Sequence, residues 1–478
     1  MSKYEANIVV IGAGSGGLVA SLIAAAVKAK VVLIERHKMG GDCLNTGCVP
    51  SKAILRSAKI ANYMHRAEEF GIESVDVKPV FSKVLKRVHK VIEAIEPHDS
   101  VERFTGLGVG CVQGEAEIID QHTVKVGERS ITTKSIIIAS GARPFVPPIP
   151  GLDKVPYLTS DNIWELEHQP KRLVVLGGGP IGCELSQAFS KLGSQVTIVE
   201  MAGQLMGRED ADVAETITKR FQADGINVLT NHKAIKITDD GSKVIHCESE
   251  NGVIEVPFDD ILVAVGRKAN SDEMNLDKFG IKLRPNGTIE TDEYLRTAVP
   301  NIFACGDVTG PYQFTHTASH QAWYATVNAL FGFVKKFKVD YRVIPWATFT
   351  MPEVARVGLN ESDAKEKGID YEVTRYGIDD LDRAIADGEA HGFVKVITPR
   401  GKDKVLGVTI VGHHAGDLIA EYVLAMKYNL GLNKILGTIH LYPSLAESNK
   451  FVAGNWKRNN QPHGLLKLVE KLHNWRRS

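Results

Sequence analysis

The chain has 478 residues, which is enough for about three domains and a large buried core. Lys plus Arg and Asp plus Glu each total 57, so the formal net charge is zero and gives no global electrostatic case for binding nucleic acid or a membrane. The longest apolar stretch, near residues 18–34, is interrupted by Lys28 and Lys30 and is too short to span a membrane. Six cysteines, and a start without an apolar signal core, predict a cytoplasmic protein rather than a secreted one.

The N-terminal segment predicts a nucleotide-binding βαβ unit. Residues 7–11 are a β-branched run, an apolar helical stretch follows, and residues 31–34 are predicted to form the next strand of a buried parallel sheet. Between the first strand and the helix stand the glycines of a G-x-G-x-x-G pattern: Gly12, Gly14 and Gly17. In that order they permit a tight turn, a close approach to a pyrophosphate, and close packing of helix on strand. Glu35 ends the second strand, where a carboxylate can accept hydrogen bonds from ribose hydroxyls.

Two cysteines follow, Cys43 and Cys48, with four residues between them and glycines around them. Such a pair fits two buried small side chains, part of a metal site, or a disulfide. Zinc sites usually need a second closely spaced ligand pair, and the remaining cysteines are scattered singly along the chain: Cys111, Cys183, Cys247 and Cys305. The short gap favours a disulfide, and Lys52 and a following helix would lower the pKa of one thiol.

A second βαβ unit lies about 165 residues further on. An amphipathic helix over residues 81–95 and a proline-rich linker over residues 143–152 separate the two units. Residues 173–176 and 196–199 are predicted strands on either side of a helix over residues 180–192. The same pattern of glycines stands between the first of these strands and the helix: Gly177, Gly179 and Gly182. Two such units in one chain indicate that one polypeptide holds two nucleotides.

The acidic residue of the second unit predicts which nucleotide binds there. Glu200 ends the second strand of this unit, at the position equivalent to Glu35. A carboxylate suits the free 2′-hydroxyl of NAD and repels the 2′-phosphate of NADP. The four residues after Glu200 contain no arginine that could receive a phosphate, and Arg208 is the nearest. We therefore expect NAD.

The pattern of predicted strands and helices changes after about residue 345. Strands are predicted over residues 394–397 and 406–411, and a helix over residues 415–429, which together indicate an α+β domain. The chain ends in a basic amphipathic tail whose apolar residues could form one helical face: Leu465, Leu466, Leu468, Val469, Leu472 and Trp475. Packing of this tail on the body of the chain or on a partner subunit is the favoured interpretation, and docking to a membrane surface is the less favoured one.

Taken in order, these segments resemble the class I flavoprotein disulfide reductases, the family of dihydrolipoamide dehydrogenase, glutathione reductase and mercuric reductase. Residues 40–52 are close to the family's redox motif, and four more pieces match in sequence: residues 138–144, 265–267, 300–307 and 349–353. The resemblance covers nearly the whole chain. It implies an α/β fold with two Rossmann-like domains that bind FAD and NAD, and an α+β C-terminal dimerisation domain.

The resemblance also implies roles for single residues. Cys48 would be the thiol next to the flavin, and Cys43 the thiol that exchanges with the disulfide substrate. Lys52 and Glu184 would form an ion pair near the flavin ring. The first glycine loop would bind FAD, the second would bind NAD, and three further residues in the matching pieces are candidates for binding a cofactor: Gly141, Gly266 and Asp307.

One position departs from the family's pattern. Disulfide-exchanging members carry His-Pro-Thr and a glutamate five residues after the histidine, and the partner subunit supplies this pair as the acid–base catalyst. Alignment on Pro443 puts Tyr442 in the place of the histidine, keeps Glu447, and leaves His440 two residues early. Tyrosine, with a pKa of about 10, shuttles protons poorly at neutral pH. We therefore expect weak turnover of dihydrolipoamide or glutathione unless His440 supplies the proton.

The functional prediction is an enzyme: a dihydrolipoamide dehydrogenase-like oxidoreductase that moves electrons between NAD(H) and a small-molecule or lipoyl-type disulfide through Cys43 and Cys48. Mercuric reductases also have tyrosine at the position of Tyr442, so a mercuric reductase-like enzyme with another acceptor is the alternative. Against it, no cysteine follows Cys305, whereas mercuric reductases add a C-terminal cysteine pair. A flavin-loaded redox sensor with slow turnover is an alternative of another class.

The resemblance implies a homodimer, because the C-terminal segment must reach the disulfide of the other subunit. No metal site is predicted. The predicted division of the chain is an FAD-binding domain, an NAD-binding domain, a central segment, an interface domain and the tail, at residues 1–148, 149–271, 272–344, 345–460 and 461–478.

Overall fold

The computed structural model of the protein describes residues 3–73, 78–272 and 274–478. Within these residues the chain forms two compact units. Unit 1 comprises the described residues within 3–64, 78–203 and 222–340, and unit 2 comprises residues 65–73, 204–221 and 341–478. Each unit has its own sheets and its own hydrophobic core. The five-part division predicted from the sequence stays a prediction.

Unit 1 begins with a mixed sheet in which the strand order is β3-β2-β1-β6-β5-β4, with β16 also paired to β6. The strands are β1 (Ala6–Ile11), β2 (Val31–Glu35), β3 (Val109–Gln113), β4 (Ala116–Asp120), β5 (Thr123–Val126), β6 (Arg129–Ile138) and β16 (Ile302–Ala304). Strands β3, β2, β1, β6 and β16 are joined by parallel pairing, and β4, β5 and β6 by antiparallel pairing.

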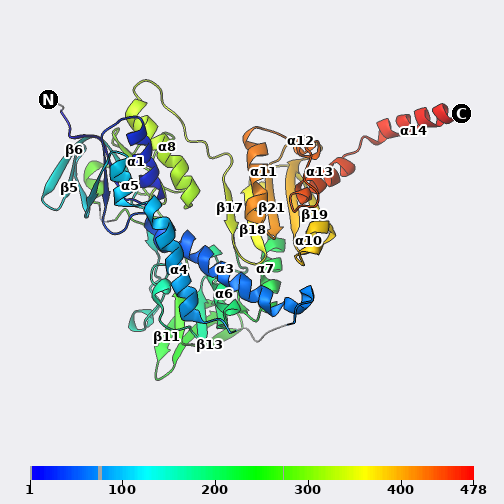
Figure 1. The fold of residues 1–478 in the computed structure, drawn as a ribbon, viewed down its shortest axis with the longest axis horizontal. Coiled ribbons are helices and arrows are strands. Elements are labelled where there is room, and N and C mark those ends of the chain that lie inside the picture. The colour runs from blue at the N-terminus through cyan, green and yellow to red at the C-terminus, as the bar shows by residue number, and fades with distance from the viewer. Residues whose placement is uncertain (1–2, 74–77, 273) are drawn as a thin grey trace. The chain divides into compact units, whose positions relative to one another are not determined.

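Both faces of this sheet are covered. Successive residues of a strand point to opposite faces, so Ile8 and Val10 of β1 enter one buried cluster while Val9 and Ile11 enter another. The helices α1 (Ser15–Ala26) and α8 (Thr315–Phe331) pack side by side on the first of these faces (Figure 1). A strand buried on both faces is apolar throughout, and this is why β1 has the continuous hydrophobic run of a parallel sheet.

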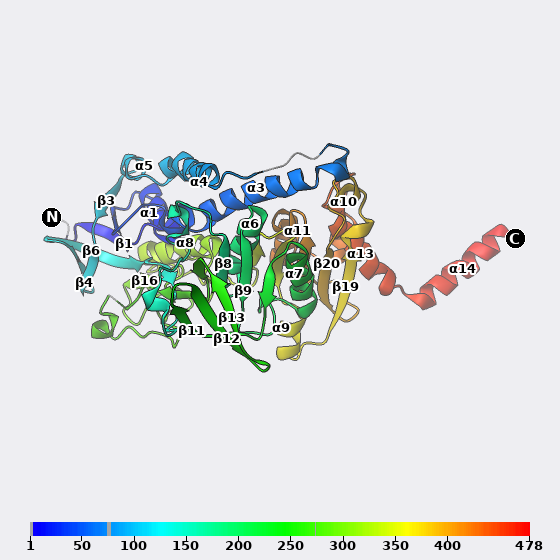
Figure 2. The ribbon, with the colours of Figure 1, turned by 90° about the horizontal axis from the view of Figure 1, so that it is seen from below.

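The second βαβ segment also lies inside unit 1. A parallel sheet has the order β10-β9-β8-β14, and a separate antiparallel sheet has the order β11-β12-β13 (Figure 2). The bounds are β8 (Arg172–Leu176), β9 (Gln195–Val199), β10 (Asn227–Leu229), β14 (Asp260–Val263), β11 (Lys233–Asp239), β12 (Lys243–Ser249) and β13 (Gly252–Phe258). Helix α6 (Pro180–Lys191) connects β8 to β9 and buries Phe189 and Leu185.

The proline-rich residues 143–152 differ in part from the predicted linker. Arg143 and Pro144 belong to a short strand, β7 (Ala142–Pro144), which pairs antiparallel with β15 (Arg267–Ala269). The residue before a proline is biased toward extended backbone, so Arg143 suits a strand as well as a linker. This strand pair joins the residues that follow Ile138 to those that follow Val263.

The remaining helices of unit 1 come between β2 and β3 in the sequence. They are α2 (Gly41–Asn45), α3 (Cys48–His65), α4 (Phe81–Ile95) and α5 (Val101–Gly106), and α3 ends one residue into unit 2. The amphipathic helix predicted over residues 81–95 is confirmed as α4, which buries Phe81, Leu85 and Val88. The short 3-10 helices among the described residues of both units are η1 (Ala67–Phe70), η2 (Glu96–His98), η3 (Leu152–Lys154), η4 (Ile163–Glu165), η5 (Leu276–Phe279) and η6 (Ile378–Asp380).

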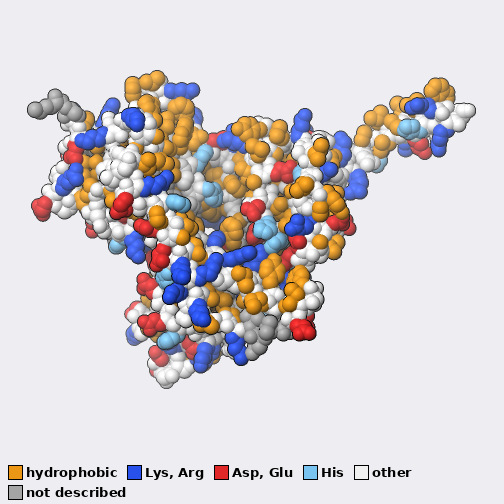
Figure 3. Space-filling view, viewed as in Figure 1, with side chains coloured by type: hydrophobic (Ala, Val, Ile, Leu, Met, Phe, Trp, Pro, Cys, Tyr) orange, Lys and Arg blue, Asp and Glu red, His pale blue; other side chains and the backbone are white. Residues whose placement is uncertain are grey.

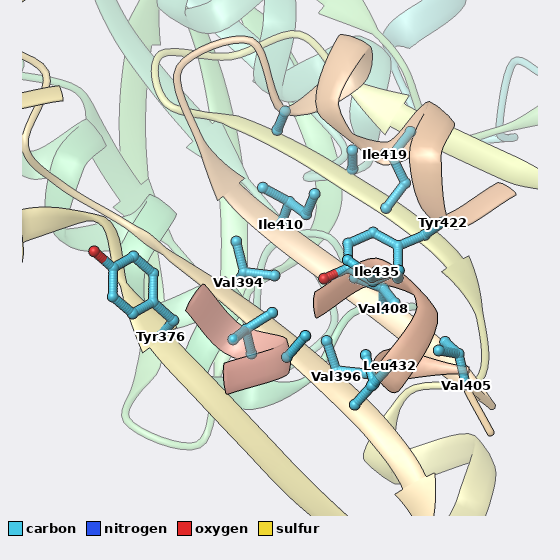
Figure 4. Packing of buried hydrophobic residues seen from close by; sticks show 14 of the residues in the cluster. Tyr376, Val394, Val396, Val405, Val408, Ile410, Ile419, Tyr422, Leu432 and Ile435 are labelled. Carbon is cyan, nitrogen blue, oxygen red and sulfur yellow. The ribbon is translucent and has the colours of Figure 1, made fainter. Parts of the chain in front are cut away.

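Unit 2 is built on an antiparallel sheet of order β17-β18-β21-β20-β19. The strands are β17 (Pro345–Thr348), β18 (Glu353–Gly358), β19 (Tyr371–Gly377), β20 (Phe393–Pro399) and β21 (Gly407–Gly412). The helices are α7 (Ala211–Ala223), α9 (Glu361–Glu366), α10 (Asp382–Ala386), α11 (Ala415–Lys427), α12 (Leu432–Leu436), α13 (Glu447–Asn459) and α14 (His463–Arg477). Tyr422 of α11 is fully buried and packs with Val408 and Ile435 in the core (Figure 4).

The predicted α/β fold class is confirmed, as are the strands of both βαβ units and the α+β character of the region after residue 345. Among residues 3–73, 78–272 and 274–478, each helix is too short or too polar to cross a membrane.

A buried lysine gathers three carboxylates in unit 2. Lys395 of β20 is only 2% exposed, and its Nζ lies 2.8 Å from Asp210, 2.7 Å from Asp212 and 3.2 Å from Glu361. Asp210 also accepts the backbone N–H groups of Glu361 and Ser362, each at 3.1 Å. The lysine charge therefore neutralises three carboxylates, one just before α7, one in α7 and one in α9, that would repel one another without it.

Lys395→Met should lower the free energy of unfolding by about 3–5 kcal/mol, the typical cost of removing one partner of a buried ion pair. Urea unfolding followed by intrinsic fluorescence measures it. The control is Lys367→Met, because Lys367 is exposed and its replacement should stay within about 0.5 kcal/mol of wild type. A Lys395→Met variant as stable as this control would show that the ion cluster contributes nothing.

Candidate active site

The first glycine loop has the geometry that its pattern predicts. Gly12 has a φ of +100°, and a Cβ there would lie 2.5 Å from the carbonyl oxygen of Ala139. A Cβ on Gly17 would lie 1.7 Å from the carbonyl oxygen of Gly12, so α1 can pack this closely on β1 only with glycine there. At Gly14 a Cβ would meet only the Cα of Gly41, at 3.9 Å, which leaves room beside the N-terminus of α1.

The second loop reproduces these three features. Gly177 has a φ of +104°, with a carbonyl oxygen 2.5 Å from an added Cβ, and a Cβ on Gly182 would lie 2.0 Å from the carbonyl oxygen of Gly177. No heavy atom of the described residues lies within 4 Å of a Cβ placed on Gly179. Each loop thus opens beside a helix N-terminus, where free N–H groups and the positive end of the helix dipole favour phosphate.

The acidic residues Glu35 and Glu200 take equivalent positions in the two βαβ segments. Glu35 accepts the N–H of Ala13 at 2.6 Å, and Glu200 accepts the N–H of Gly178 at 2.6 Å. The other oxygen of Glu200 accepts the N–H of Ala202 at 2.7 Å. Each carboxylate is therefore fixed against its own glycine loop, and each oxygen keeps a further lone pair for a hydroxyl donor.

The cysteine segment packs against the first glycine loop. Cys43 lies in α2 and Cys48 is the first residue of α3, and both are free thiols. A Cβ on Gly41, whose φ is +55°, would lie 2.7 Å from the Cα of Gly14, so the two loops approach backbone to backbone. Trp164 donates its indole N–H to the carbonyl oxygen of Thr46 at 2.8 Å, and this hydrogen bond fixes the turn between the two cysteines.

The two thiols differ in acidity. A hydrogen bond from Cys43 lowers the pKa of the Cys48 thiol to about 6, against the opposing effect of partial burial. The Thr315 hydroxyl, 3.4 Å from Cys48 Sγ, and the charge of Lys52 add to this lowering of the pKa. The same pairing and burial raise the pKa of Cys43. In the reduced protein Cys48 is therefore the thiolate and Cys43 the protonated thiol.

This difference predicts a pH dependence for the reduced protein. The rate of Cys48 alkylation by iodoacetamide should rise with a midpoint at about pH 6, because the thiolate is the nucleophile and forms above the thiol pKa. Below that pH the thiol is protonated and alkylation slows. Peptide mass spectrometry after timed labelling separates Cys48 from Cys43. Thr315→Val should move the midpoint upward, and a wild-type midpoint near that of free cysteine would contradict the assignment.

An ion pair lies next to the cysteine segment. Lys52 Nζ donates to Glu184 Oε2 at 2.8 Å, and Lys52 also lies 3.3 Å from the Ser51 hydroxyl. Glu184 is buried in α6 whereas Lys52 is half-exposed, so this contact joins the helix after the cysteines to the helix of the second glycine loop. The pair implied by the resemblance is present; its place beside a flavin stays a prediction.

A second charged group connects the cysteine segment to the end of β16. The Arg267 guanidinium forms an ion pair with Asp42, and its Nε lies 3.7 Å from Asp307. Burial raises the pKa of Asp307 to about 6, although the charge of Arg267 acts against this rise. Gly266 accepts the N–H of Phe145 at 3.0 Å and Gly141 accepts the N–H of Asn270 at 3.0 Å, so both predicted glycines lie where the strand pair β7–β15 returns to the sheets.

The C-terminal candidates lie in unit 2, where two of them have specific partners. The Tyr442 hydroxyl donates to Asp382 at 3.0 Å, and this hydrogen bond raises the pKa of Tyr442. His440 Nε2 lies 2.9 Å from Glu421, and its Nδ1 lies 3.1 Å from the carbonyl oxygen of Thr438. Both ring nitrogens of His440 are therefore engaged.

Glu447, the third C-terminal candidate, is nearly buried at the start of α13. Its carboxylate accepts the backbone N–H of Ser444 at 3.2 Å. This contact fixes the carboxylate below the loop that carries Tyr442, at the N-terminus of a helix, where a negative charge is stabilised.

The four cysteines outside the pair are scattered singly through unit 1. Cys183, Cys247 and Cys305 are fully buried, as expected for small apolar residues, and Cys111 is half-buried. Sequence reasoning missed the contacts of Thr315 and Trp164. The nearest signal for Thr315 is its position at the start of α8, just after the matching piece that ends at Asp307, but nothing local pairs it with a cysteine 267 positions away.

Two nucleotide-type loops and one cysteine pair in a single chain define a dithiol oxidoreductase that works with two dinucleotides. The chain belongs to the pyridine nucleotide-disulphide oxidoreductase family: residues 6–322 match that family and residues 344–452 match its dimerisation domain. The family uses FAD and a pyridine nucleotide. The second match supports a homodimer.

Similar proteins carry two kinds of name. A "Mercuric reductase" from Bacillus cereus is 35% identical over 454 residues, covering 94% of this chain and 71% of that protein. A "Dihydrolipoyl dehydrogenase" from Chlamydia muridarum is 37% identical over 450 residues, covering 92% of this chain and 94% of that protein. The solved structure of the HOCl-induced flavoprotein disulfide reductase RclA from Escherichia coli superposes with a TM-score of 0.84 at 27% identity, covering 94% of this chain and 99% of that one. The protein is a flavoprotein disulfide oxidoreductase.

Proposed function

We propose that the protein is an NAD-linked, dihydrolipoamide dehydrogenase-like enzyme that moves electron pairs between NAD(H) and a small-molecule or lipoyl-type disulfide. The observation that carries this proposal is the unequal thiol pair, with Cys48 acidic at the start of α3 and Cys43 protonated beside it. Bound FAD supplies a two-electron carrier between the nicotinamide and the cysteine pair. The homodimer acts in the cytoplasm, where such a pair is kept available for exchange.

The residues divide the exchange chemistry between them. Cys43, once deprotonated, attacks one sulfur of the substrate disulfide and forms a mixed disulfide, and the other substrate sulfur leaves as a thiol. The Cys48 thiolate then attacks Cys43 Sγ, which releases the second substrate thiol and closes the Cys43–Cys48 disulfide. Lys52, held by Glu184, places a positive charge near the Cys48 thiolate. The reverse order of steps oxidises a dithiol.

The glycine loops and their acids hold the cofactors in this proposal. Gly12, Gly14, Gly17 and Glu35 bind FAD with help from Gly141 and Asp307, and the equivalent residues of the second unit bind NAD with help from Gly266. The open side of each loop, beside Gly14 and beside Gly179, is where a pyrophosphate can approach the helix N-terminus. Asp307 has a pKa of about 6 because it is buried, so a hydrogen-bond donor placed against it would stabilise the carboxylate.

Steady-state rates should show a preference for NADH. Glu200 is fixed against Gly178 and Ala202, so a 2′-phosphate would meet its carboxylate. We expect kcat/KM for NADH to exceed that for NADPH by roughly tenfold or more, which corresponds to about 1.4 kcal/mol of repulsion. Equal or higher kcat/KM with NADPH would contradict this. Glu200→Gln, which keeps the size and removes the charge, should narrow the ratio.

A panel of acceptors with NADH tests the function itself. Turnover above about 10 s⁻¹ with lipoamide, a typical enzyme rate, supports the proposal. A mercuric reductase-like activity is the second candidate, favoured by Tyr442 and by the similarity to the Bacillus cereus protein, and rapid NADH-dependent loss of Hg(II) would support it. Negligible turnover with every acceptor would overturn both and favour a redox sensor.

A further inference from the structure

The C-terminal helix α14 lies beyond the part of the chain that the family explains. The match to the dimerisation domain ends at residue 452, and α14 begins at His463 after the segment Asn460–Pro462. None of its residues is buried in the described chain, and Figures 1 and 2 both show it projecting from the rest of unit 2. The sequence favours packing of the tail on the body of its chain or on a partner subunit. In the described residues the apolar face of α14 turns to solvent, so packing on its own chain is not seen, and packing on a partner subunit stays a prediction.

The apolar side chains of α14 form one stripe. Leu465, Leu468, Leu472 and Trp475 follow one another three or four positions apart, which places them on the same helix face. Leu468 is 64% exposed and Trp475 is 74% exposed. An isolated helix of 15 residues is marginal in water, so a surface that covers this stripe would stabilise the helix.

The charge of α14 narrows the choice of that surface. Lys467 and Lys471 lie four positions apart along one edge of the stripe, Arg476 and Arg477 end the helix, and Glu470 is its only acidic residue. Lys467, Lys471 and Arg476 are all exposed. Figure 3 shows this mixture of hydrophobic and basic groups over the projecting helix.

A second copy of the chain is a poor occupant for this helix. In a twofold dimer the same patch contacts itself, so two copies of a helix with four Lys or Arg residues and one acidic residue would be brought together. Like charges at such short range are unfavourable. A bilayer with anionic headgroups instead offers an apolar layer to the leucines and negative charge to the lysines, and tryptophan is enriched at this boundary.

We propose that α14 is a membrane-surface anchor that lays its leucine–tryptophan stripe into the headgroup region of an anionic phospholipid bilayer. The enzyme would then be a peripheral membrane protein whose redox domains remain in the aqueous phase. Only residues 460–462 separate α14 from α13, and α13 packs its Val452 and Trp456 into the core of unit 2. The proposal does not depend on which disulfide the enzyme uses.

Co-sedimentation of the full-length protein with lipid vesicles tests the anchor. The vesicles contain phosphatidylcholine alone or equal parts of phosphatidylcholine and phosphatidylglycerol, and pelleted protein is measured on gels. Wild type should bind the anionic vesicles, and less so as salt rises. Lys467→Glu combined with Lys471→Glu should lower binding at least about 30-fold, since each basic residue near an anionic surface contributes about fivefold. Leu468→Ser combined with Leu472→Ser should abolish binding to the anionic vesicles.

A matched control separates anchoring from net charge. Lys83→Glu combined with Lys86→Glu makes the same change in net charge on α4, where both lysines are exposed, and should leave binding within twofold of wild type. Loss of binding in this control, equal binding to vesicles of phosphatidylcholine alone, or no binding by wild type would overturn the proposal. A second-copy contact would instead appear as a smaller sedimentation coefficient of the leucine variant without lipid, together with no vesicle binding by wild type.

Discussion

Replacing Cys48 with serine should lower NADH-dependent disulfide reduction by several orders of magnitude, and replacing Cys43 should do the same. Serine keeps the size of the side chain but does not form a thiolate or a disulfide at neutral pH, so neither the mixed disulfide nor its resolution can occur. NADH-dependent reduction of ferricyanide, which needs no thiol exchange, should persist in both variants. That second activity shows that the protein is folded and loaded with its cofactors.

A third variant, Cys43→Ala, tests the thiol pairing. Alanine has no hydrogen-bond donor, so Cys43→Ala leaves Cys48 with Thr315 and Lys52 nearby but removes the hydrogen bond from Cys43, the largest cause of its lowered pKa, and the alkylation midpoint of Cys48 should rise. Cys111→Ser is the matched control, because Cys111 is half-buried in β3 and has no role in the proposed exchange. Disulfide turnover that survives in Cys48→Ser, or that falls equally in Cys111→Ser, would contradict the relay.

The parts of the fold that the sequence predicted are those fixed by local pattern. The continuous apolar run from Ile8 to Ile11 indicates a strand that is buried on both faces. The spacing of the glycines indicates that a side chain at Gly12 or Gly17 would clash with nearby carbonyl oxygens. These features depend on residues within about one βαβ unit of each other. They were therefore predictable without knowledge of the tertiary structure.

The contacts that tune the site are of another kind. Thr315 reaches Cys48 from 267 positions away, Trp164 reaches Thr46 from 118, and Arg267 reaches Asp42 from 225. Each of them joins segments that meet only after the sheets of unit 1 have formed, and no periodicity or spacing in the sequence pairs them. The family resemblance implied Lys52 and Glu184, which are 132 positions apart, but it did not extend to these supporting residues.

Tyr442 is the position at which the local chemistry and the proposed function disagree. Burial and pairing raise the pKa of Cys43, so this thiol needs a proton acceptor before it can attack a substrate. The hydrogen bond to Asp382 raises the pKa of Tyr442 above that of ordinary tyrosine, which leaves even less phenolate to act as a base at neutral pH. His440 is no ready substitute, because Glu421 and the Thr438 carbonyl oxygen already engage both of its ring nitrogens.

Tyr442→His should therefore raise lipoamide turnover by about 10²-fold or more, within the range of about 10²–10⁴ that general acid–base catalysis contributes. Histidine titrates near neutral pH, and Glu447 is kept at the family's offset to orient it. The gain should appear in kcat, with a new acid limb in the pH–rate profile that reports protonation of the histidine.

Two further variants separate this base from the other candidates. Tyr442→Phe removes the bond to Asp382 without adding a base, so it should bring no gain. His440→Gln should leave wild-type turnover nearly unchanged if His440 only supports the loop, whereas a large loss would identify His440 as the proton carrier. If Tyr442→His brings no increase in lipoamide turnover, the tyrosine does not limit the exchange, and the natural acceptor must be one whose reduction needs no proton transfer at this position.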